Sequence, residues 1–215
     1  MITTPELIES LAADAGPVRR LAPLARAAGW LAFAALILAL VAVSHAPRPD
    51  LALRIADPRF LCGVGGALAT GVLAAVAAFA VSVPGRSRAW LLLPLPGALL
   101  WALAIGEGCV SWAGLPADGS FPGDEAGCLA ILVLIGAPLA LAMLIMLRHA
   151  ARIAPAAVGT LGGLAVAGLT ATALSFFHIH DASAQILIWN LGIALSLVVL
   201  GRAFASRMLA WVAPA

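Results

Sequence analysis

The feature that most constrains this chain is a series of long apolar segments whose central residues carry no charge. Six such segments of about twenty residues follow one another along 215 residues, which is the length a helix needs to cross a bilayer. Backbone groups within hydrocarbon cannot bond to water, so these segments must be helical. We therefore predict an all-α polytopic membrane protein, a bundle of six transmembrane helices at Ala27–His45, Phe60–Val83, Ala89–Ile105, Cys128–Leu147, Pro155–Phe177 and Ala184–Leu200.

Three other interpretations of the apolar segments fit less well. A transmembrane β-barrel would show alternating polar and apolar residues rather than solid apolar runs. Only 10% of the residues are charged, against about 25% in a soluble domain. The first segment ends in Ser44-His45-Ala46, which resembles a signal-peptide cleavage site, but its late onset and the acidic residues before it argue against cleavage.

The arginines set the predicted orientation. With six spans both termini share one side, and that side receives nine of the twelve arginines, which predicts that both termini are cytoplasmic. The loop between the first two spans is an exception, because it places Arg48, Arg54 and Arg59 outside. Its centre, "DLALRIA", is predicted to form a short helix along the outer interface. The domains are then a cytoplasmic segment at 1–26, the bundle at 27–201 and a cytoplasmic tail at 202–215.

The N-terminal segment predicts a short amphipathic helix. Thr4 is the expected cap, Pro5 suits the first turn, and Gly16-Pro17 ends the helix. The apolar residues at helical spacing on one face are Leu7, Ile8 and Leu11. A helix of this length is marginal alone in water, so it needs a surface, which could be the membrane, the chain's own loops or another protein.

The polar residues exclude several functions. The middle of each span lacks Asp, Glu, Arg and His, which disfavours the alternative of a small transporter or channel. A membrane redox enzyme is disfavoured by the absence of a CxxC motif, and a purely structural subunit stays open. No nucleophile–base pair or phosphate loop occurs, so we expect no enzyme and no cofactor. The net charge of +2 predicts no direct nucleic-acid contact.

Several motifs together resemble the NrsF-like six-span membrane anti-sigma factors. These motifs are "LIESLAADAGPVRRLAPLAR", "RPDL", "LLPLPGALLWAL", "CLAILVLIGAPLALAMLIMLRHAARIAP" and "GTLGGLAVAGLTATALSFFHIHDASAQILIWNLGI". The resemblance covers nearly the whole chain. It implies a protein of the bacterial inner membrane that sequesters an extracytoplasmic-function sigma factor and releases it on an external stress signal. The sigma-binding residues that it implies are Leu7, Ile8, Leu11, Val18, Arg19 and Arg20.

The resemblance also implies an external sensor. The family pattern has two outer cysteines, of which one matches Cys128, whereas Ile179 occupies the place of the other, between His178 and His180. Cys109, expected in the neighbouring outer loop, is a possible substitute partner. Three alternatives stay open: a thiol switch, a metal site formed by these cysteines and histidines, or simple packing.

Overall fold

The computed structural model describes residues 3–14, 22–112, 125–148, 155–177 and 199. Throughout these ranges every regular element is helical, which confirms the predicted all-α class. The elements in chain order are α1 (Thr4–Asp14), α2 (Pro23–Ser44), α3 (Leu51–Ile55), α4 (Pro58–Val81), the 3₁₀ helix η1 (Arg88–Leu92), α5 (Leu95–Trp112), α6 (Glu125–Leu147) and α7 (Pro155–Phe177).

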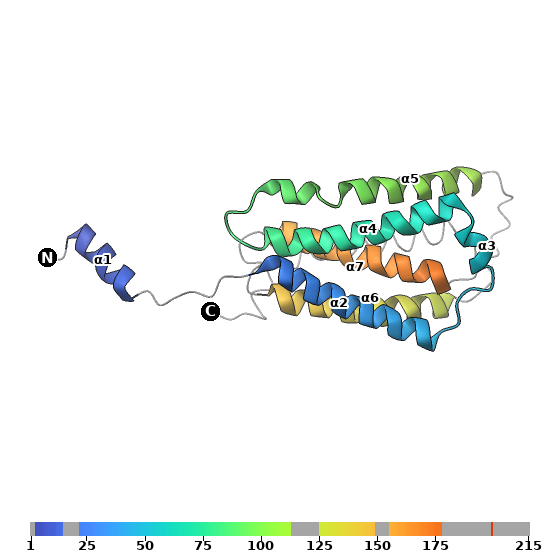
Figure 1. Cartoon of the computed structure of the whole chain (residues 1–215), viewed down its shortest axis with the longest axis horizontal. Coiled ribbons are helices and arrows are strands. Elements are labelled where there is room, and N and C mark those ends of the chain that lie inside the picture. The colour runs from blue at the N-terminus through green and yellow to red at the C-terminus, as the bar shows by residue number, and fades with distance from the viewer. Residues whose placement is uncertain (1–2, 15–21, 113–124, 149–154, 178–198, 200–215) are drawn as a thin grey trace.

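Helix α4 lies at the centre of the bundle. It packs against α2, α5 and α7, while α6 packs against α2 and α7 (Figure 1). Most buried residues of α4 are glycine or alanine. The larger fully buried side chains come mainly from the surrounding helices; those below 2% exposure include Trp30, Phe79, Ile135, Leu139 and Leu174.

Glycine lets the backbones of neighbouring helices touch α4. A Cβ added to Gly66 would lie 2.6 Å from the backbone nitrogen of Trp101 on α5, and one added to Gly97 would lie 2.7 Å from that of Thr70. A Cβ on Gly168 of α7 would meet the backbone nitrogen of Gly71 at 2.7 Å. Small residues allow this close approach in helices surrounded by lipid, where association rests on van der Waals packing. The bundle therefore has two backbone-to-backbone interfaces, α4–α5 and α4–α7.

Among the described residues, three helices are long enough and apolar enough to span a membrane. They are Pro23–Ser44, Pro58–Val81 and Ala156–Phe177, and two shorter apolar helical stretches cover Arg88–Ala104 and Leu132–Leu147. All five correspond to predicted spans. The predicted sixth span, 184–200, lies outside the described residues apart from Val199, so the number of six spans stays a prediction.

The third predicted span differs from the structure at both ends. We expected one helix from Ala89 to Ile105 with kinks at its prolines, but Pro94 separates η1 from α5, because proline has no N–H to continue the hydrogen-bond ladder. At the other end α5 continues to Trp112, since no proline interrupts the chain before Pro116.

The span hydroxyls mostly bond to their own helices. Thr70 donates to the carbonyl of Gly66 at 2.6 Å, and Thr172 donates to that of Gly168 at 2.8 Å. Thr170 is the exception among the described residues, because its buried hydroxyl has no partner. These hydroxyls therefore serve packing rather than a polar pathway through the bundle.

Two adjacent glycines on α4 provide a matched test of this packing. Gly66→Ala should lower the free energy of unfolding by about 1–3 kcal/mol, because its Cβ would press on the backbone of Trp101. Gly65→Ala meets no atom within 4 Å and should raise it by about 0.5–1 kcal/mol, the usual gain of alanine over glycine within a helix. Equal stability of the two variants in a denaturant titration of detergent-solubilised protein would contradict the backbone contact.

Candidate functional site

The start of α1 has the glutamate half of a capping box, with Thr3 as its first residue. The backbone N–H of Thr3 donates to Glu6 Oε2 at 2.8 Å, and the N–H of Leu7 donates to the carbonyl of Thr3 at 3.0 Å. Hydrogen bonds from the backbone and side chain of Thr3 lower the pKa of the Glu6 carboxyl. Thr4, the expected cap, is instead the first helical residue, because Glu6 has the three-residue spacing from Thr3 that a capping box requires.

The apolar stripe of α1 is exposed. Leu7, Ile8 and Leu11 are 49%, 63% and 64% exposed. At 100° per residue these three side chains share one face, while Glu6 and Glu9 point to the other side. Figure 1 shows α1 separated from the other helices, and residues 3–13 are all exposed. The described chain therefore does not cover this face, and the fold-back of α1 onto the bundle is not observed.

The other predicted sigma-binding residues, Val18, Arg19 and Arg20, lie outside the described residues. The chain is described again from Ala22, and α2 begins at Pro23. Proline fits this position because the first helical turn needs no N–H donor.

The first turns of α2 are fixed to the bundle by two side chains that sequence reasoning missed. Arg26 donates to the carbonyl of Met146 near the end of α6, and its guanidinium lies 6.0 Å from the ring centroid of Phe79 on α4. One turn later the buried indole of Trp30 donates to the carbonyl of Leu139 at 3.2 Å. The i,i+4 spacing of Arg26 and Trp30 could have indicated that the two side chains share a face of α2. The segment that carries α1 is thus attached to a well-packed helix start.

The predicted sensor residues are only partly described. Cys128 lies in the first turn of α6, and the outer position of that end stays a prediction, whereas Cys109 lies within α5 rather than in a loop. His178 and His180 lie outside the described residues. Within the part of the chain that is described, no group of three His, Cys, Asp or Glu side chains could hold a metal ion. The structure therefore neither brings the four sensor residues together nor separates them.

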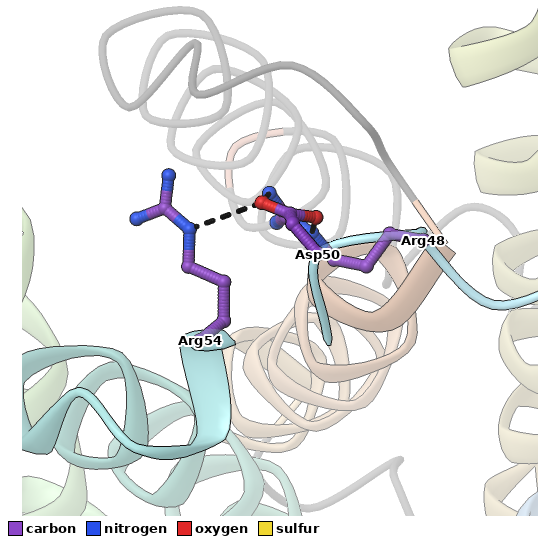
Figure 2. Close-up of polar contacts among 3 residues, drawn as sticks. All are labelled: Arg48, Asp50 and Arg54. Carbon is purple, nitrogen blue, oxygen red and sulfur yellow. Dashed lines mark hydrogen bonds and ion pairs between the residues drawn. The ribbon is translucent and has the colours of Figure 1, made fainter. Parts of the chain in front are cut away.

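The sequence did not predict that polar side chains in the loop between α2 and α4 form one cluster. Arg48 has only 5% exposure and holds the Asp50 carboxylate with two bonds, from Nε at 2.6 Å and from an Nη at 2.7 Å. Arg54 of α3 donates to the same carboxylate at 3.3 Å, so the two arginines lie on either side of Asp50 (Figure 2). The helix expected in this loop is confirmed as α3, and Asp57 caps α4 by accepting from the N–H of Arg59 at 2.9 Å.

The cluster attaches the loop to the C-terminal end of α7. The backbone N–H of Arg48 donates to the carbonyl of Phe176 at 3.1 Å. Helix C-terminal carbonyls lack intrahelical donors, so this bond satisfies one of them. The arginine side chain is then held in place by Asp50, whose pKa the Arg48 guanidinium lowers to about 2.

The cluster predicts a defined pH dependence of stability. The pKa of Asp50 is lower in the folded protein, so its contribution is complete above the ordinary value of 3.8 and is lost as pH falls through about 2. Asp50→Asn should lower the melting temperature at neutral pH and reduce the loss of stability between about pH 4 and pH 2. Thermal unfolding monitored by circular dichroism would check this. Identical melting curves for Asp50→Asn and the unaltered protein would contradict the role of the ion pair.

Comparison with protein families finds a match over most of the chain. A family model described as "Negative regulator of sigma F" matches residues 11–211. This range includes the end of α1 and every helix of the bundle. No curated protein and no solved structure shows significant similarity to the chain.

Proposed function

Since the chain belongs to the NrsF family of negative regulators of sigma F, we propose that it is a membrane-bound anti-sigma factor. It sequesters an extracytoplasmic-function sigma factor at the bacterial inner membrane. An external stress signal, an oxidant or a heavy metal, releases the sigma factor. The family supports a regulatory role and a sigma-factor partner, and the apolar helices support association with a lipid bilayer.

The observation that carries the partner assignment is the uncovered apolar face of α1. An amphipathic helix whose stripe is exposed fits the groove-binding mode of recognition, in which spaced apolar anchors enter a hydrophobic groove. Leu7, Ile8 and Leu11 supply the anchors, and their exposure of about half or more leaves area to bury on binding. The charged residues of α1 are all acidic, which disfavours its binding to an anionic membrane surface. In this proposal Val18, Arg19 and Arg20 extend the contact toward the membrane.

The proposed release uses α6 as the connection between signal and partner. This helix carries Cys128 in its first turn and Met146 near its last residue, where Arg26 of α2 donates to the backbone. A change at the outer end of α6 would move this contact and with it the start of α2, which leads to α1. Coupling of this kind requires two bundle states that differ at both ends. In this proposal the sensor centres on Cys128. It either forms a disulfide with Cys109 or binds a metal ion together with Cys109, His178 and His180.

The sigma-binding face is tested by adding charge to α1. Leu7→Asp combined with Leu11→Asp should reduce co-purification of the sigma factor by at least about tenfold, because each buried leucine contributes about 1.5–3 kcal/mol. The measurement is recovery of each extracytoplasmic-function sigma factor of the source genome, co-expressed with the full membrane protein and purified from detergent.

The matched control adds the same two charges outside the stripe of α1. In Ser10→Asp with Ala13→Asp, Ala13 lies on the face opposite the stripe and Ser10 lies beside that face, and both residues are exposed. This variant should retain the sigma factor. Equal retention by both double variants, at equal membrane insertion, would rule out the apolar face as the binding surface.

Thiol labelling tests on which side of the membrane α1 and the loop between α2 and α4 lie. A regulator of this type needs its partner inside the cell and its signal outside. Cys62, Cys109 and Cys128 are replaced by serine, and one new cysteine is introduced by Ser10→Cys on α1 or by Ala56→Cys after α3. Both positions are exposed. In intact cells a membrane-impermeant maleimide should label Ala56→Cys and leave Ser10→Cys unlabelled until the cells are permeabilised. The reverse result would exclude the anti-sigma proposal.

A further inference from the structure

Helix α6 contains a proline in its middle. Pro138 has no N–H to donate to the carbonyl of Leu134, and its ring crowds that carbonyl, so a helix bends most readily at such a residue. The proline divides α6 into a first half, 125–137, which carries Cys128, and a second half, 139–147. The angle between these two halves can therefore change more easily than the angle between two parts of an uninterrupted helix.

The second half of α6 is joined to the start of α2 by two side chains. The buried indole of Trp30 donates to the carbonyl of Leu139 at 3.2 Å, and Arg26 donates to that of Met146. Both acceptors follow Pro138 in the chain. The start of α2 and the second half of α6 should therefore move as one unit, and a change in the angle at Pro138 turns this unit relative to the first half.

The first half of α6 meets α7 beside a hydroxyl that makes no hydrogen bond. Thr170 of α7 is 5% exposed, and its Oγ1 has no partner among the described residues. This oxygen lies 3.7 Å from the position that a Cβ on Gly136 of α6 would take, an ordinary van der Waals distance. The hydroxyl of Thr172 donates to its own helix, whereas that of Thr170 lies against α6. A buried hydroxyl without a partner is unfavourable, so this position of α6 leaves a favourable bond unmade.

We infer that α6 bends at Pro138 between two positions and that Thr170 stabilises the second one. In the second position a backbone carbonyl of α6 beside Gly136 accepts from the Thr170 hydroxyl. The carbonyl keeps its helical bond, because its oxygen has two lone pairs. The position in the structure keeps Ile135 fully buried and leaves the hydroxyl unpaired. The second position exchanges part of that packing for the hydrogen bond, so each position has an interaction that the other lacks.

The bend has a role in release only if the proposed function holds. Pro138 lies between Cys128 and the two contacts with α2, so a bond formed at Cys128 would favour one position and turn the start of α2. This supplies the two-state element that coupling between the ends of the bundle requires. The bend itself needs neither signal nor sigma factor, so the purified protein should show it even where sigma capture fails.

The test measures distances between two spin labels by double electron–electron resonance in the full-length protein in detergent. The three native cysteines are replaced by serine. Leu24→Cys on α2 with Ala130→Cys on the first half of α6 places Pro138 between the label and the joined unit. Leu40→Cys with Ile145→Cys is the matched control pair, because it also joins α2 to α6 but uses the second half. All four labelled positions are exposed.

The pair at Leu24 and Ala130 should give two distances, and the control pair should give one. Pro138→Ala restores the missing N–H and should leave the first pair with a single distance. Thr170→Val keeps the size of the side chain and removes the hydroxyl. It should lower the ratio of the second population to the first about fivefold, which corresponds to about 1 kcal/mol. Thr170→Ser keeps the hydroxyl and should retain both populations.

Thermal unfolding gives a second measurement that a packing role would move in the opposite direction. Thr170→Val should melt at the same or a higher temperature, since the structure shows no bond for it to break. A lower melting temperature would assign the hydroxyl to the packed state and overturn the inference. So would a single distance for the pair at Leu24 and Ala130 in the unaltered protein, or two populations that Thr170→Val leaves unchanged.

Discussion

Direct contact between helix backbones is the constraint on which the rest of the structure depends. Lipid tails are as apolar as leucine, so burial of apolar side chains gives little drive for helices to associate within a bilayer. The bundle instead relies on α4, whose glycines admit the backbones of α5 and α7 to distances that no side chain would permit. The polar contacts of Arg26 and Arg48 occur where helices packed against α4 begin or end.

Polar side chains are used at the helix ends, where backbone groups lack partners. Arg26 donates to a carbonyl in the last turn of α6, and Arg48 uses its backbone N–H in the same way on α7. In both cases a loop or a helix start is fixed to an end of the bundle by the unpaired carbonyls found there. This arrangement leaves the centres of the spans without charge and places the contacts of the charged residues at the two ends of the bundle.

Hydropathy predicted most helices to within a few residues, because apolar length is a local property. Helix α7 has the predicted bounds, and α6 begins three residues earlier than expected. The errors occurred where a single residue decides the outcome. Pro94 divided one expected span, and the choice of cap between two adjacent threonines depended on their spacing to Glu6.

The candidate sites were predictable to different degrees. The stripe of α1 follows from its periodicity, so Leu7, Ile8 and Leu11 could be named in advance. The burial of Arg48 could not, because it depends on a carbonyl at Phe176, far away along the chain. The roles of Arg26 and Trp30 depend in the same way on how α6 lies against α2. Sequence patterns report which face of an element is apolar, whereas these contacts require the packing itself.

The isolation of α1 has an evolutionary consequence. Its residues are exposed and lie apart from the other described helices, so under the proposed function their exchange would alter partner choice at little expense in folding stability. Under the same proposal, lineages that duplicate such a gene could diverge in the protein they hold while keeping one membrane-embedded scaffold. Recognition would drift quickly at the N-terminus, and the glycine contacts of α4 would change slowly.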